Sequence, residues 1–94
     1  MATSTIKRKI KITDEWSNVG QLSWSQSGVW FAVDNSIKTN GQVLAVTVLD
    51  WTQLPSVAIA SPYGDHIIFM CNSKPGTNAR VKIRIAEEVG GGSA

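Results

Sequence analysis

The chain carries two strand-length runs, one near each end, in which apolar and basic residues alternate, with Arg8 as the one exception. The first is residues 6–12, IKRKIKI, and the last is residues 80–85, RVKIRI. Successive side chains of an extended chain point to opposite faces, so each run predicts a half-buried β-strand with one apolar and one cationic side. The sides expected to face the core are Ile6, Ile10 and Ile12 in the first run and Val81, Ile83 and Ile85 in the last.

Shorter hydrophobic segments separated by turn-forming residues lie between these two runs. They predict further strands at residues 21–25, 29–33, 42–49, 57–60 and 66–71. No segment shows convincing helical periodicity, although Asp14-Glu15-Trp16 could open one helical turn. Short strands with turn signals every 8–12 residues are typical of sandwiches and barrels. The sequence therefore predicts an all-β fold, a small antiparallel β-sandwich or partly closed barrel of about seven short strands.

The segment 42–49, QVLAVTVL, is the most hydrophobic part of the chain and lacks alternation. Strands buried on both faces read as continuous apolar runs, so we expect this strand to cross the centre of the sheet or core.

Two dipeptides predict tight turns. Asn40-Gly41 favours positive φ angles and a sharp reversal, and Pro75-Gly76 is typical of a type II turn.

Length and composition predict one domain, residues 1–89, followed by a flexible Gly/Ser tail at 90–94 of the kind that expression vectors leave. No segment resembles a signal peptide or a membrane span, so we expect synthesis in a cytoplasm and no membrane insertion. The single cysteine, Cys71, excludes an internal disulfide, and we expect it to be a small buried hydrophobe.

Most of the cations belong to the two basic runs. They are Lys7, Lys9, Lys11, Arg80, Lys82 and Arg84, out of nine Lys and Arg in the chain. If the two strands were neighbours, these side chains would form a stripe able to meet phosphate, which makes a nucleic-acid-binding domain an alternative. The net charge is only +2 and no aromatic residues interleave with the cations. We therefore favour a solvated sheet face and argue against nucleic acid.

Groups that could carry catalysis are scarce. His66 is the only histidine, and the odd spacing from Cys71 places the two on opposite faces of one strand. Asp34-Asn35-Ser36 offers oxygen ligands but lacks the spacing of a calcium-binding loop. We expect a non-enzymatic protein with no metal and no cofactor.

Aromatic residues among polar neighbours are the better candidates for a ligand site. Indole and phenol rings can bind the apolar faces of sugars while nearby amides and carboxylates take the hydroxyl groups. The predicted ligand-binding residues, chosen for their loop or strand-end positions, are Trp24, Trp51, Tyr63, Asp65 and His66. Trp24 and Trp51 are expected to be exposed because polar residues flank both. The alternative is that these rings fill the core or an oligomer interface.

Residues 42–86 resemble a known kind of module. The resemblance rests on the hydrophobic strand, DWTQLP at 50–55, SPY at 61–63, IIFM at 67–70 and VKIRI at 81–85. This pattern is similar to the C-terminal head or tip modules of phage tail-fibre and baseplate receptor-binding proteins. The resemblance implies a trimeric β-sandwich in the virion that attaches to a host cell-surface saccharide or protein receptor. A structural virion or assembly domain that binds only other proteins is the alternative.

Overall fold

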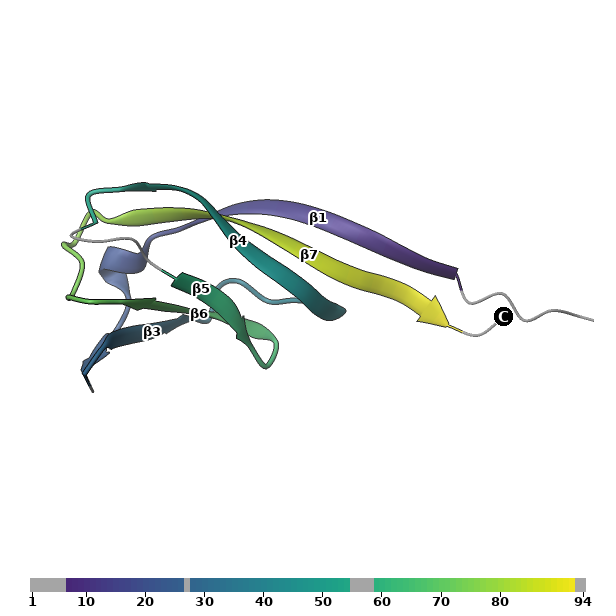
Figure 1. Cartoon of the computed structure of the whole chain (residues 1–94), viewed down its shortest axis with the longest axis horizontal. Helices are drawn as coiled ribbons and strands as arrows, with labels where there is room; N and C mark the ends of the chain where they lie inside the picture. Colours follow the sequence, from purple (N-terminus) through teal and green to yellow (C-terminus); the bar gives the residue numbers. More distant parts are fainter. Residues whose placement is uncertain (1–6, 27, 55–58, 93–94) are drawn as a thin grey trace, which may run out of the picture.

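The computed structural model describes residues 7–26, 28–54 and 59–92 and contains two antiparallel sheets in these ranges. The elements are β1 (Lys7–Ser17), the 3-10 turn η1 (Val19–Gln21), β2 (Ser25–Gln26), β3 (Trp30–Asp34), β4 (Gln42–Thr52), β5 (Ile59–Tyr63), β6 (His66–Cys71) and β7 (Arg80–Gly92). One sheet has the strand order β1-β7-β4 and the other β2-β3-β6-β5. They form two layers (Figure 1), which confirms the predicted all-β sandwich. Within the same ranges there is no helix long and apolar enough to cross a membrane.

β1 and β7 extend together beyond the sandwich as an arm (Figure 1). β4 begins at Gln42, opposite Glu88, whereas β1 and β7 continue pairing as far as Lys7 and Gly92. Figure 1 shows this two-stranded arm projecting from the body. The radius of gyration is 16.0 Å, compared with about 12 Å for a compact domain of this length. Because β7 continues through Gly92, the first three residues of the expected tail belong to a strand.

The core lies between the two layers. Val81, Ile83 and Ile85 of β7 pack against Ile67 and Phe69 of β6, and all five are 2% exposed or less. The inward side predicted for the last basic run is therefore confirmed. Cys71 also belongs to this core, as expected, and β6 has the predicted bounds.

The inward side predicted for the first basic run is wrong. Ile10 and Ile12 are 54% and 55% exposed. The register pairs Ile12 with Ala86, which lies on the opposite face of β7 from Ile85. Directly opposed residues share a face of the sheet, so this register turns the apolar side of β1 outward. Ile6 lies outside the described residues.

β4 is an edge strand and not the central strand that its composition predicts. Among the described residues it pairs only with β7, and the pairing shifts register between Val43 and Ala45 and again between Val48 and Asp50. Each shift inserts one extra residue, Leu44 at the first and Leu49 at the second. Their side chains are 50% and 38% exposed. An extra residue breaks the in-out alternation without burying both faces. The continuous apolar run therefore reflects bulges, not two-sided burial.

Neither predicted tight turn forms as expected. Gly41 and Gly76 do not have positive φ angles, and the turn after Pro75 is closed by a hydrogen bond from Ala79 N to Gly76 O at 3.1 Å. Gly41 is needed for space, because a Cβ there would lie 2.2 Å from the Glu88 carbonyl oxygen. Two glycines between paired strands do have positive φ: Gly28, between β2 and β3, and Gly64, in the β5–β6 turn.

Some of the remaining boundaries differ from the prediction. The expected strand at 21–25 is largely wrong, because η1 ends at Gln21, residues 22–24 are irregular and only Ser25 belongs to β2. The expected strand at 29–33 is β3. The segment 14–16 belongs to β1 and forms no helical turn. β5 begins at Ile59, and residues 57–58 lie outside the described residues.

Candidate functional site

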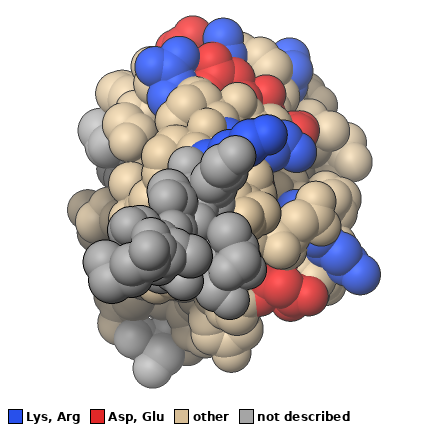
Figure 2. Space-filling view, turned by 90° about the vertical axis from the view of Figure 1, so that its right-hand side faces the viewer, with Lys and Arg blue, Asp and Glu red and all other residues tan. Residues whose placement is uncertain are grey.

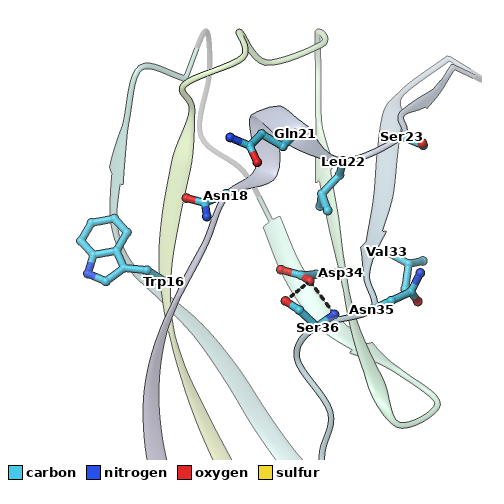
Figure 3. Close-up of a pocket in the computed structure, with 9 residues that line it drawn as sticks. All are labelled: Trp16, Asn18, Gln21, Leu22, Ser23, Val33, Asp34, Asn35 and Ser36. Atoms are coloured by element: carbon cyan, nitrogen blue, oxygen red, sulfur yellow. Dashed lines mark hydrogen bonds between the residues drawn. The ribbon is translucent and has the colours of Figure 1, made fainter.

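A polar groove follows β1 on the side where the two sheets face each other. Its larger part is a pocket of about 490 Å³ (Figure 3). The pocket is lined by Trp16, Asn18, Gln21, Leu22, Ser23, Val33, Asp34, Asn35 and Ser36. These residues come from the end of β1, from η1 and its following loop, and from the end of β3. Segments far apart in sequence thus meet at the edge of the sandwich.

Asp34 holds this pocket together. Its carboxylate is buried and accepts hydrogen bonds on both oxygens: the Ser17 hydroxyl donates to Oδ2 at 2.5 Å, and the Ser36 backbone N–H donates to Oδ1 at 2.9 Å. The Ser36 hydroxyl also donates to Oδ1. These bonds tie the end of β3 to the end of β1 and fix the turn at Asn35–Ser36. Because both oxygens are occupied, we assign Asp34 a positioning role.

Three amide side chains remain available around this fixed carboxylate. Asn18, Gln21 and Asn35 are exposed, and none has a side-chain hydrogen bond to another described residue. Each amide offers two donor hydrogens and one acceptor oxygen, which matches hydroxyl groups that both donate and accept. Leu22 is half-buried and supplies the apolar part of the lining. This combination suits an uncharged polar ligand.

The groove continues along the inward side of β1 as a smaller pocket of about 140 Å³. Both pockets include Ser36. The smaller one is lined by Lys11, Thr13, Glu15, Ser36, Ile37, Lys38, Asn40, Ile85 and Glu87. Glu87 is buried, and its Oε2 accepts hydrogen bonds from the backbone N–H groups of Asn40 and Gly41 at 2.8 and 3.0 Å. This carboxylate therefore fixes the start of β4 where it borders the groove.

The Trp16 ring does not contribute a stacking surface inside the pocket. Figure 3 shows the indole pointing away from Asp34 and Ser36. The register places Trp16 opposite Lys82, on the outer face of the three-stranded sheet, and the Arg80 guanidinium carbon lies 4.5 Å from the ring centroid. A cation over an aromatic face is a favourable contact. One face of this ring is thus already covered by Arg80.

The structure divides the five predicted site residues among three places. Tyr63, Asp65 and His66 lie together at the β5–β6 turn, where Tyr63 pairs with His66 and is 58% exposed. His66 Nε2 lies 3.3 Å from Asp65 Oδ1. The backbone N–H of Thr39 donates to the Asp65 carbonyl, so this turn adjoins the β3–β4 connection.

The two tryptophans of that prediction do not join this turn. Trp51 is 43% exposed, as expected, but lies near the far end of β4, roughly 30 Å along the strand from its beginning beside the turn. Trp24 is half-buried against the core, and its indole N–H donates to the Val19 carbonyl at 2.7 Å. The predicted exposure of Trp24 is therefore wrong, because its polar neighbours belong to a loop that folds the ring inward.

The sequence reasoning missed Asn18, Gln21 and Asn35. Asn35 lies in the polar stretch 34–36, whose side-chain oxygens suggest metal ligands and not a saccharide site. No three His, Cys, Asp or Glu side chains of the described ranges come together as a metal site requires. An available signal was the clustering of amides at strand ends. Only the fold, however, shows that the ends of β1 and β3 meet.

The cations of β1 and β7 do not form one stripe, although these strands are neighbours. Lys82 and Arg84 oppose Trp16 and Asp14 on the outer face, while Lys11 opposes Glu87 on the other. Arg84 makes a two-pronged contact with Asp14, Nε to Oδ1 at 2.9 Å and Nη2 to Oδ2 at 3.0 Å. In Figure 2, blue and red residues lie together over the upper part of the molecule. The side chain of Lys7 lies outside the described part of the chain.

Three pKa shifts follow from these surroundings. The hydrogen bond from Arg84 lowers the pKa of Asp14, and the same contact raises the pKa of Arg84. Burial raises the pKa of the Cys71 thiol, which donates to the Ser73 carbonyl at 2.9 Å. A thiol with a raised pKa is mostly protonated at neutral pH and a poor nucleophile. Cys71 and His66 lie on opposite faces of β6, as their spacing predicts.

Comparisons of the chain with protein-family models, with curated proteins and with solved structures found no match.

Proposed function

We propose that this protein is a non-enzymatic adhesion module that binds an uncharged saccharide in the groove beside β1. The observation that carries the proposal is the arrangement of Asn18, Gln21 and Asn35 around a pocket of about 490 Å³. Their amides are exposed and make no hydrogen bonds to described residues. The carboxylate of the pocket, Asp34, already accepts hydrogen bonds from Ser17 and Ser36. Such a site can exchange hydrogen bonds with sugar hydroxyls without leaving a charge unpaired.

The biological setting of the proposal comes from the resemblance of residues 42–86 to phage tail-fibre and baseplate tips. In that setting the module is a virion protein, made in the host cytoplasm, and the saccharide belongs to the host cell surface. A shallow, open site gives weak binding for one copy. Several copies on one fibre, as in a trimer, would raise the overall affinity through avidity.

The test is a glycan array followed by titration of the best-binding glycan. Asn18→Ala, Gln21→Ala and Asn35→Ala should each weaken binding about two- to tenfold, the worth of one net hydrogen bond. Folding should be preserved because these side chains are exposed, and Asn18 makes no side-chain cap bond to η1. The matched control is Asn72→Ala, an exposed amide in the β6–β7 connection, which should bind like the original protein.

Tyr63→Ala separates this groove from the β5–β6 turn. We expect it to leave glycan affinity unchanged. Loss of binding in Tyr63→Ala together with normal binding in the three amide variants would move the site to the turn. A folded protein that binds no glycan on the array would contradict the proposed function itself.

A further inference from the structure

The smaller pocket of the groove beside β1 carries polar side chains that have no partner in the described part of the chain. Five of its lining side chains make no hydrogen bond, ion pair or ring contact with a described residue: Lys11, Thr13, Glu15, Lys38 and Asn40. Four of them are exposed and Thr13 is half-buried. Polar groups that converge on a concave site are the groups that orient a bound ligand.

A buried carboxylate holds the wall of each pocket. Asp34 and Glu87 are each 4% exposed. Asp34 accepts the backbone N–H of Ser36 at 2.9 Å, and Glu87 accepts that of Asn40 at 2.8 Å. Backbone bonds therefore fix these walls, while the amide side chain of Asn40 stays available. The smaller pocket thus repeats the arrangement of the larger one.

The two pockets meet at Ser36, which lines both. Its hydroxyl hydrogen is donated to Asp34 Oδ1, so the hydroxyl oxygen can still accept a bond from a ligand. Lys11 in the smaller pocket and Asn18 in the larger one are seven residues apart in the chain. An extended segment of that length spans roughly 23 Å, several times the width of one sugar ring. The groove therefore has room for more than one linked sugar unit.

The formal charges of the smaller pocket balance. Its lining holds two lysines, Lys11 and Lys38, and two glutamates, Glu15 and Glu87. A ligand with a net charge gains little from such a lining, whereas a neutral hydroxyl group can accept from an ammonium and donate to a carboxylate. Hydrogen bonds to charged groups are also stronger than those between neutral groups. The smaller pocket therefore suits an uncharged unit rich in hydroxyl groups.

We propose that the ligand is a linear, uncharged oligosaccharide that occupies both pockets. One sugar unit lies beside the free amides of the larger pocket, and a neighbouring unit lies beside Lys38 and Asn40. This inference rests on the proposed function, because it extends the same saccharide site along β1. It makes the groove a reader of a stretch of sugar chain and not of a single terminal sugar.

The test compares fragments of the best-binding glycan that contain one, two, three and four sugar units. Calorimetric titration of the original protein should show affinity rising about five- to thirtyfold from the single sugar to the fragment that fills both pockets. That gain is the worth of one or two additional net hydrogen bonds. Units added beyond this length should change the affinity little, because they lie outside the groove.

Variants in the smaller pocket separate its contribution from that of the larger one. Asn40→Ala and Lys38→Met should weaken binding of the four-unit fragment about two- to tenfold and leave the single sugar unaffected. Asn18→Ala should weaken both ligands. Folding should be preserved because both side chains are exposed, and Asn40 bonds to Glu87 through its backbone. The matched control is again Asn72→Ala, which should bind both ligands normally.

Backbone amide chemical shifts confirm that each variant is folded and locate the ligand. The four-unit fragment should move the shifts of Lys38 and Asn40, and the single sugar should not. Equal affinity for one and four units would overturn the inference, as would normal binding of the four-unit fragment by Asn40→Ala and Lys38→Met. Either result would leave a saccharide site in the larger pocket, and so the proposed function, intact.

The uncharged class has its own test. A preference for an acidic chain of the same length, with affinity that falls as salt is added, would overturn it. Failure of every glycan to bind is a different outcome, because it would contradict the proposed function and this inference together.

Discussion

β1 and β7 have nearly the same alternation of basic and apolar residues, but the apolar side of β7 faces the core and that of β1 faces away from it. In β7 the apolar residues Ile83 and Ile85 are almost fully buried, while in β1 Ile10 and Ile12 are more than half exposed. β7 is the central strand of its sheet and β1 is an edge strand. Alternation thus predicts two unlike faces, but pairing decides which face meets the core.

Cross-strand charges favour the observed orientation of β1. The register sets Asp14 against Arg84 and Lys11 against Glu87. A slip of one residue would turn every side chain of β1 to the other face. It would separate Asp14 from Arg84, although Glu15 would then reach the face of Arg84 and Lys82. Opposite charges across strands stabilise a sheet modestly, so the pair of Asp14 and Arg84 contributes to the observed register.

The largest expected effect comes from shortening equivalent isoleucines in the two strands. Ile83→Ala removes a fully buried side chain and should lower the free energy of unfolding by about 2–5 kcal/mol. Ile12→Ala should lower it by less than about 1 kcal/mol, because the side chain is largely in water. The free energy of unfolding of each variant is measured by urea denaturation.

A milder variant keeps this comparison measurable if Ile83→Ala does not fold. Ile83→Val should cost about 0.5–1.5 kcal/mol, and Ile12→Val should have almost no effect. Equal losses at the two positions would show that β1 also points its isoleucines into the core.

The sequence predicts the fold class, the short apolar strand β6 and the alternating strand β7. β6 has the predicted bounds, and the inward side of β7 is Val81, Ile83 and Ile85. Prediction fails for β4, where Leu44 and Leu49 are bulged residues and the apolar run mimics a central strand. Bulges and edge positions are set by pairing partners, which local patterns do not encode.

The candidate site was predicted less well than the fold. Tyr63, Asp65 and His66 do lie together, because they belong to one hairpin turn. The groove needs the ends of β1 and β3 to meet through the bond between Ser17 and Asp34, which are 17 residues apart in the chain. That contact depends on how the sheets stack, so amides near strand ends could be noticed in the sequence, but their meeting in one pocket could not be predicted from it.

A smaller effect is expected from the ion pair that links the two strands. Arg84 lowers the pKa of Asp14 below its unfolded value, which is about 3.9. The contribution of the Asp14–Arg84 ion pair to stability is therefore present above pH ~4 and is lost as the pH falls through the lowered pKa of Asp14. Asp14→Asn should melt slightly below the original protein at neutral pH. The difference should vanish in acid, as thermal unfolding across the pH range measures.

High salt provides the control for this prediction. Both side chains are partly exposed, so added salt should reduce the difference in melting temperature at neutral pH. A difference that stays constant from neutral pH to pH ~3 would contradict a role for the charge of Asp14.

The most direct test of the account is the pairing of β1 with β7 in solution. Nuclear Overhauser contacts between backbone protons across the two strands report which residues are opposed. We predict contacts that pair Ile12 with Ala86 and Asp14 with Arg84. Contacts that instead pair Ile12 with Ile85 or Glu87 would contradict the account, because they would turn the isoleucines of β1 inward and its lysines away from the groove.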